Sequence, residues 1–149
     1  MGDGVIISGI YKGFNELLKL GWIDKLPKLI AVQSTGSDAL VKYLKTNKFE
    51  YKPAITIADS ISAGSPRNLY MAAEAVKESN GFAIAVTDEE ILSAQKDFIK
   101  RTGILCEPSS ASVYAVYKKL LAEDSISSSE KILLLITGNG LKDVKALRN

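Results

Sequence analysis

The chain has 149 residues, with one cysteine and no histidine. Its 19 Lys and Arg residues against 17 Asp and Glu residues leave a net charge of +2, and this balance argues against a nucleic-acid partner. The lack of histidine excludes Ser-His-Asp and Cys-His catalytic sites, and we expect no metal site. A single cysteine cannot form an internal disulfide, which fits a reducing cytoplasm. No segment has the pattern of a targeting sequence or of a membrane span, so no membrane partner is expected.

The first half of the chain predicts helices and one strand. Apolar residues at helical spacing predict a first helix, and Gly21 is suited to end it (Ile7, Ile10, Phe14, Leu17 and Leu18). We expect a short buried strand over residues 29–32 and a short helix over residues 38–45. Residues 46–66 carry many turn formers and are expected to be irregular.

The second half continues the alternation of helix and strand. A helix is expected over residues 68–79 and a strand over residues 82–86. Thr87 and Glu90 have the spacing of a capping box at the start of the next helix, and Gly103 is suited to end it. Ser109 or Ser110 is expected to cap a further helix, and residues 132–136 predict a third clear strand. The alternation predicts a single α/β domain, a three-layer α/β/α sandwich with a mainly parallel sheet of about four strands.

Two glycine-containing turns are candidate binding sites. Gly2-Asp3-Gly4 stands at a helix start, where free amides and the helix dipole favour an anion such as a phosphate. The third glycine of a dinucleotide fingerprint is missing, because that position is Ile7, and no GK[ST] follows. Residues 137–140 follow a predicted strand, and the Thr137 hydroxyl could bond a ring nitrogen. A flexible terminus and an ordinary turn are the alternatives for the two segments.

Other polar residues admit two interpretations each. Glu107 precedes a helix, where it could point into a cleft or only balance the helix dipole. The small polar residues of 56–66 could serve a site or a surface connection. Cys106 has no neighbouring base and is interpreted as a buried apolar residue, and Lys142 as a solvated lysine.

Taken in order, these motifs resemble the C-terminal part of the threonine synthases, pyridoxal-phosphate enzymes of the tryptophan-synthase-β structural type (fold type II). The resemblance spans nearly the whole chain, and its more specific parts are residues 103–108 and 137–143. The other matching segments are residues 2–14, 30–33, 56–61, 66–67 and 87–91.

The resemblance implies a role for several residues and assigns no catalytic side chain. The cofactor phosphate would be held by the backbone amides of the first loop (Gly2, Asp3, Gly4 and Val5). The Thr137 hydroxyl would meet the pyridine nitrogen. A further set would lie near the cofactor ring or the substrate (Ala58, Asp59, Ser60 and Glu107). Asn139 departs from the pattern, since histidine would be expected there as readily.

The family's Schiff-base lysine belongs to a Ser-Phe-Lys-Asp motif in the N-terminal half, and no such motif occurs here. We therefore expect residues 1–149 to be the C-terminal part of a larger enzyme. The complete enzyme would convert O-phospho-L-homoserine and water into L-threonine and phosphate. The fragment would be inactive, with weak or absent cofactor binding. Truncation would expose apolar surface, so a homo-oligomer is expected.

Several alternatives remain open from the sequence. One is a related pyridoxal-phosphate enzyme, such as a threonine or serine dehydratase or a cysteate synthase. Another is a truncated, non-catalytic module. A nucleotide-binding module is a third, against which the incomplete glycine fingerprint counts.

Overall fold

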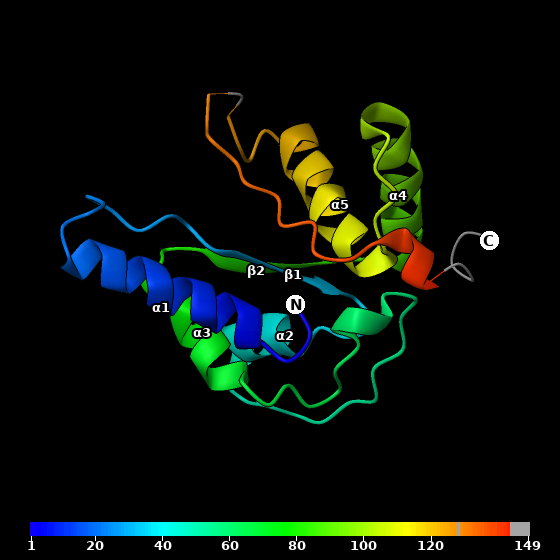
Figure 1. Ribbon diagram of the computed structural model, residues 1–149. Helices are drawn as coiled ribbons and strands as arrows, with labels where there is room; N and C mark the ends of the chain where they lie inside the picture. The colour runs from blue at the N-terminus through cyan, green and yellow to red at the C-terminus, as the bar shows by residue number, and fades with distance from the viewer. Residues whose placement is uncertain (128, 144–149) are drawn as a thin grey trace.

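Two parallel strands, β1 (Ile30–Ser34) and β2 (Phe82–Val86), form the central layer of the computed structural model, which describes residues 1–127 and 129–143 (Figure 1). Ile30 pairs with Phe82, and the register continues to Ser34 beside Val86. Both strands come from short apolar runs, the composition typical of parallel strands covered on both faces.

Three helices cover one face of this sheet: α1 (Val5–Lys19), α2 (Ala39–Thr46) and α3 (Leu69–Glu78). The apolar sides of α2 and α3 pack against β1 in one buried cluster (Ala31, Leu40, Leu69, Ala72, Ala73 and Val76), and α1 packs mainly on α3. Ile7 of α1 packs on the edge of this cluster. The helical spacing of apolar residues in the sequence therefore corresponds to the faces that these helices bury.

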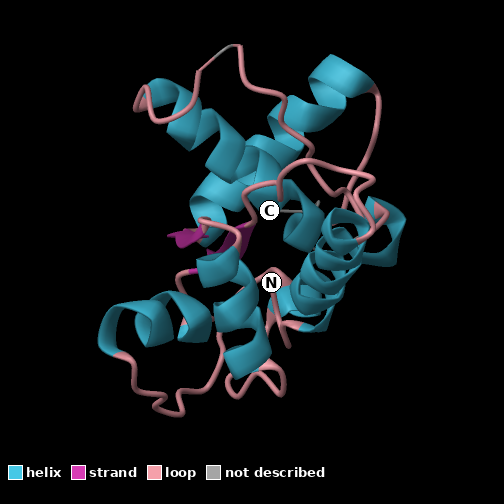
Figure 2. Ribbon diagram, turned by 90° about the vertical axis from the view of Figure 1, so that its left-hand side faces the viewer, coloured by secondary structure: helices cyan, strands magenta, loops and turns pink. Residues whose placement is uncertain are grey.

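The other face is covered by α4 (Asp88–Thr102) and α5 (Pro108–Ala122). A second cluster joins these two helices to both strands, and it includes Val32, Val86, Ile91, Phe98 and Val116. Figure 2 shows the helices on the two sides of the strands, so three layers are present. The α/β class with a parallel sheet between helical layers is confirmed.

Both ends of helix α4 lie where the sequence predicts them. The Glu90 N–H donates to Thr87 Oγ1 at 3.2 Å, and the Thr87 N–H donates to Glu90 Oε2 at 2.7 Å. This is the predicted capping box, and it fixes where α4 begins. Gly103 ends α4 with a φ of 72°, a left-handed conformation that glycine adopts without strain.

Two expectations need correction. Residues 132–136 pair with no strand among the described residues, and the described sheet has two strands where about four were expected. Helix α5 is not capped by Ser109 or Ser110, because Glu107 is its N-cap residue and Pro108 takes the first helical position. Proline is favoured there, since its fixed φ suits the helix and the missing N–H would have no intrahelical partner.

The segment between α2 and α3 is irregular, as predicted, apart from the short 3-10 helix η1 (Asp59–Ile61). Among the described residues, no helix is long and apolar enough to cross a membrane.

Asp97 connects α4 to α5 on the surface. Its carboxylate accepts hydrogen bonds from Lys118 Nζ at 3.0 Å, Arg101 Nε at 2.9 Å and the Tyr114 hydroxyl at 3.0 Å. The Lys118 ammonium above all, with Arg101, lowers the pKa of Asp97 from its ordinary 3.8 to about 2. The carboxylate therefore stabilises the folded state above about pH 4, and this contribution is lost as the pH falls toward 2.

We predict that Asp97→Asn lowers the urea midpoint of unfolding at neutral pH, because three donors lose an ionised acceptor. The difference from the unmodified chain should shrink as the pH falls from about 4 toward 2, where the native carboxylate is also protonated. Asp24→Asn, at an exposed aspartate outside this cluster, is the control. A difference of constant size across this pH range would contradict the prediction.

Candidate functional site

An open cleft of about 160 Å³ lies where η1, the start of α5 and the turn after residue 137 meet. Its lining is mostly polar (Asp59, Ser60, Glu107, Pro108, Ser109, Lys142 and Asp143). The segments that form it are far apart in the sequence, and they meet at one end of the sheet layer (Figure 1).

Glu107 is the centre of the polar contacts in this cleft. Its side chain is only 8% exposed, and its Oε2 accepts a hydrogen bond from Ser60 Oγ at 3.0 Å. Lys142 Nζ donates to Ser60 Oγ at 3.0 Å and lies 3.7 Å from Glu107 Oε2. The buried carboxylate is therefore held by a hydroxyl and faces a cation, the arrangement that lowers the cost of burying a charge.

Gly138 lies directly against this carboxylate. A Cβ at residue 138 would be 2.1 Å from both Cδ and Oε1 of Glu107, so only glycine fits without displacing that side chain. The Gly138 carbonyl accepts the Glu107 N–H at 3.0 Å. Ser110 Oγ accepts the N–H groups of Thr137 at 3.2 Å and Gly138 at 2.9 Å. The glycine turn is thus fixed onto the first turn of α5.

The N-terminal loop lies beside η1. A Cβ at Gly2 would be 3.1 Å from Ile61 Cα and 3.3 Å from the Ser60 carbonyl oxygen. Gly4 has a φ of 89°, and a Cβ there would be 2.9 Å from the Ala72 Cβ. Helix α1 starts at this glycine with no side-chain cap and no acidic residue in its first turn. Its first amides therefore have no intrahelical acceptor and favour an anion.

Asp88 positions the segment that carries η1. Its Oδ1 accepts hydrogen bonds from Thr56 Oγ1 at 2.6 Å and Ser34 Oγ at 3.2 Å, and its Oδ2 accepts the Ile57 N–H at 3.0 Å. Asp88 is the first residue of α4, where the helix dipole also favours a carboxylate. One side chain therefore ties the end of β1 to the segment before η1.

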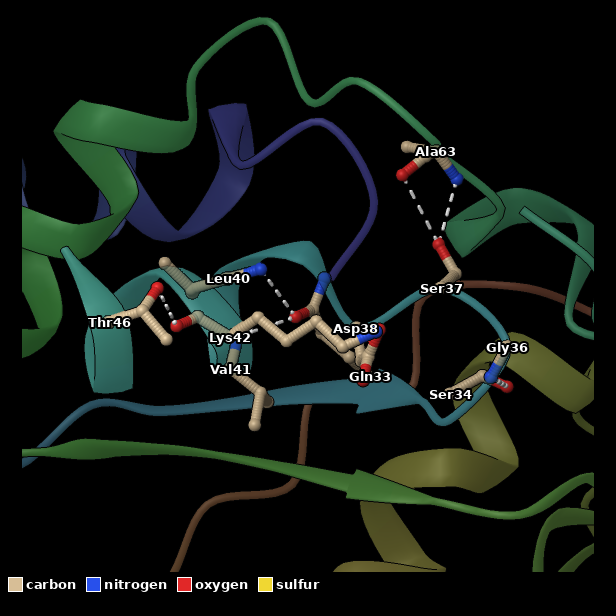
Figure 3. Close-up of polar contacts among 10 residues, drawn as sticks. All are labelled: Gln33, Ser34, Gly36, Ser37, Asp38, Leu40, Val41, Lys42, Thr46 and Ala63. Carbon is tan, nitrogen blue, oxygen red and sulfur yellow. Dashed lines mark hydrogen bonds and ion pairs between the residues drawn. The ribbon is translucent and has the colours of Figure 1, made fainter. Parts of the chain in front are cut away.

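Two further side chains hold the turn after β1, and Figure 3 shows both. The fully buried Gln33 accepts the N–H groups of Leu40 at 2.9 Å and Val41 at 3.1 Å through Oε1, so it caps α2 from the neighbouring strand. Ser37 Oγ accepts the Ala63 N–H at 3.0 Å. Gln33 therefore fixes the start of α2, and Ser37 fixes the chain just after η1.

Residues 1–138 match the protein family described as "Pyridoxal-phosphate dependent enzyme". The chain belongs to this family. It is 43% identical, over 98% of its length, to the threonine synthase of Methanocaldococcus jannaschii. It is 41% identical, over 96% of its length, to the threonine synthase of Methanosarcina acetivorans. The chain spans only 37% and 36% of the lengths of these two relatives.

Solved structures of two other enzymes share the fold. An L-serine ammonia-lyase from Rhizomucor miehei matches 99% of this chain with a TM-score of 0.74 at 23% identity, and the chain covers 47% of it. Maize serine racemase matches 99% of this chain with a TM-score of 0.71 at 22% identity, and the chain covers 43% of it. The chain therefore has part of the fold called fold type II, as the resemblance implied.

The structure brings most of the predicted cofactor residues close together. Asp59, Ser60 and Glu107 line the cleft, and the loop of Gly2, Asp3 and Gly4 lies next to η1. Asp3 is tied to the start of α3, since its carbonyl accepts the Asn68 N–H at 3.0 Å. Ala58 differs, because it is fully buried in the core cluster and does not line the cleft.

The residues present fit the cofactor of this family. The first turn of α1 offers the unbonded amides that a phosphate needs, and Val5 at its start is exposed. Thr137 is exposed, and its hydroxyl has no hydrogen-bond partner among the described residues. Residues 1–127 and 129–143 contain no cluster of metal-ligating side chains. Which of these residues contact the cofactor stays a prediction.

Sequence reasoning missed three residues that build the site. Lys142 is 67% exposed, as expected of a solvated lysine, but it also bonds Ser60 in the cleft, a contact that no sequence pattern indicated. Ser110 was expected to be a helix cap, and it instead holds the turn at residues 137–138. Asp88 lies between Thr87 and Glu90 of the predicted capping box, and no role of its own is predicted for it. An aspartate at the first position of a helix after a buried strand is a signal that could have pointed to it.

We predict that Gly138→Ala exposes the neighbouring Cys106 to thiol reagents. Cys106 is 1% exposed, and burial raises its pKa, so labelling of the native chain should be slow. The new methyl group would displace the Glu107 carboxylate and loosen the turn that forms a bridge between Asn139 and Cys106. The labelling rate should rise by about tenfold or more, which corresponds to about 1.4 kcal/mol of lost local stability.

Gly13→Ala is the matched control, because a Cβ at residue 13 has no neighbour within 4 Å. That variant should label as slowly as the unmodified chain. Equal labelling of both alanine variants and the unmodified chain would show that Gly138 does not support the site.

Proposed function

We propose that this chain is the part of a threonine synthase that binds the cofactor phosphate and the cofactor ring. The complete enzyme would convert O-phospho-L-homoserine and water into L-threonine and phosphate. The proposal rests on 43% identity to a threonine synthase over 98% of the chain. The ammonia-lyase and the racemase share the fold at 23% and 22% identity, which supports a dehydratase-like activity less well.

Pyridoxal phosphate, when bound, supplies an electron sink for reactions at the α- and β-carbons of an amino acid. In this proposal the free amides of the first turn of α1 bind its phosphate. The Thr137 hydroxyl bonds the pyridine nitrogen, and a neutral partner there does not force that nitrogen to carry a proton. Ser60 keeps its proton on the bond to Glu107 Oε2, which orients both groups at the edge of the cleft.

The catalytic amine of the proposed reaction lies outside this chain. The 149 residues contain no Ser-Phe-Lys-Asp motif, and the two threonine synthases compared above are much longer than the chain. We therefore propose that residues beyond this sequence supply the lysine that holds the cofactor covalently and moves protons. The chain alone would form no threonine. The complete enzyme would act on a small amino acid in the cytoplasm, as a homo-oligomer.

We predict that the purified chain binds pyridoxal phosphate weakly and reversibly. Absorbance titration should give saturable binding, and pyridoxal, which lacks the phosphate, should bind at least about tenfold more weakly because the helix amides then have no anion to bind. Borohydride reduction followed by mass analysis should reveal no lysine that is modified stoichiometrically. A stoichiometric adduct at one lysine, or threonine formation by the chain alone, would refute the proposal.

We predict that Thr137→Val changes the absorbance of bound pyridoxal phosphate, because the ring nitrogen loses its hydroxyl partner. The affinity should fall only a few-fold, since the phosphate contacts remain. Thr46→Val removes another exposed threonine hydroxyl at the end of α2, and it should leave both the spectrum and the affinity unchanged. Identical spectra for the two variants would exclude Thr137 from the ring site.

A further inference from the structure

The start of α5 brings unused hydrogen-bond donors to the wall of the cleft. Ser109, the second residue of the helix, lines the cleft and is only 8% exposed. Within residues 1–127 and 129–143, its hydroxyl makes no hydrogen bond and its N–H has no acceptor. Buried hydroxyls are normally paired, so an unpaired one at a cleft wall indicates contact with a ligand. The N–H groups of a helix start favour a negatively charged group there.

Lys142 adds a cation to the same cleft. Its side chain is 67% exposed, and its ammonium bonds Ser60 Oγ at 3.0 Å. An ammonium group carries three donors, so donors remain for a carboxylate of a ligand. Lys142 and the start of α5 can therefore bind one end of a small molecule through charge-assisted hydrogen bonds.

Carboxylates outnumber this cation among the described residues that line the cleft. Asp59, Glu107 and Asp143 all line it. The side chains of Asp59 and Asp143 have no hydrogen bond or ion pair among the described residues. A simple anion would be repelled by these groups, whereas a protonated amine would be attracted.

Ser60 also favours a donor on the ligand. A lysine ammonium can only donate and a carboxylate can only accept, so Ser60 accepts from Lys142 and donates to Glu107. The single hydroxyl proton is then used, and what Ser60 still offers is a lone pair. A ligand group that meets Ser60 must therefore carry an N–H or an O–H.

The volume of the cleft limits the size of its ligand. At about 160 Å³ it is smaller than the roughly 300 Å³ at which pockets begin to hold drug-sized molecules. A small molecule that carries a carboxylate and a protonated amine satisfies both sets of groups, whereas a molecule with one charge leaves the other set unpaired.

We propose that this cleft binds a small α-amino acid in its zwitterionic form. The carboxylate of the ligand is held by Lys142 and the start of α5, and its ammonium lies among Asp59, Asp143 and the Ser60 lone pair. The inference rests on the proposed function for the choice of threonine as the amino acid, but the binding itself needs neither the cofactor nor a catalytic lysine.

Amide NMR of the chain, titrated at neutral pH and constant ionic strength, tests the proposal with three probes. L-Threonine carries both charges, L-threoninol lacks the carboxylate, and 3-hydroxybutyrate lacks the amine. L-Threonine should shift the Ser109 amide resonance saturably, with a dissociation constant on the order of 1 mM. Each of the other two probes should bind at least about tenfold more weakly, because one set of charges stays unpaired.

Lys142→Met locates the carboxylate end. It should weaken L-threonine binding by about fivefold or more and leave L-threoninol binding unchanged, because threoninol has no carboxylate for Lys142 to bind. Unchanged threoninol binding also shows that the variant keeps its fold. Lys25→Met, at an exposed lysine outside the cleft, is the matched control and should bind all three probes like the unmodified chain.

Three results would overturn the proposal: no saturable shift with L-threonine, equal affinity for all three probes, or equal effects of the two methionine variants. The outcome is separable from that of the proposed function. Pyridoxal phosphate binding without threonine binding would overturn this inference alone. Threonine binding by a chain that does not bind pyridoxal phosphate would support the amino-acid site and count against the cofactor site.

Discussion

The buried carboxylate of Glu107 is the contact on which the arrangement of the site depends. A carboxylate that is largely removed from water is costly unless donors or a cation compensate it, and Ser60 and Lys142 both do so. Its position as the N-cap residue of α5 adds the favourable end of the helix dipole. The main chain of the same residue bonds to Gly138. One residue therefore fixes η1, the start of α5 and the glycine turn relative to each other.

Polar side chains replace regular structure in the rest of the site. The long connection between α2 and α3 leaves many backbone groups without a ladder or helix partner, and such groups must be satisfied in other ways. Asp88 supplies acceptors to this connection just before η1, and Ser37 supplies contacts just after it. Gln33 does the same for the first amides of α2 from inside the core. Side chains at helix starts and strand ends therefore hold the site by accepting hydrogen bonds.

The elements of the fold were predictable because each is encoded by its own residues. The period of apolar residues placed the five helices, and the bounds of β2 agree with the predicted strand residue for residue. The capping box of Thr87 and Glu90 fixed one boundary by a local hydrogen-bond pattern. Lys142 was not predictable in this way, because its partner Ser60 lies 82 residues away in the sequence. A lysine on a polar turn has the same local pattern whether it is solvated or bonded in a cleft.

A strand prediction combines two properties, an apolar extended segment and a paired backbone, and residues 132–136 lack the second among the described residues. Their apolar side chains predict a strand, but Ile132, Leu133 and Leu135 are exposed and the segment has no strand partner among the described residues. Pairing depends on a second strand, which these residues cannot encode. The first turn of α1 is comparable, since its amides also find no acceptor among the described residues. The two features differ in charge: the helix start is the positive end of a dipole, whereas residues 132–136 are all uncharged and apolar. Only the first of these features favours a charged partner, an anion such as a phosphate.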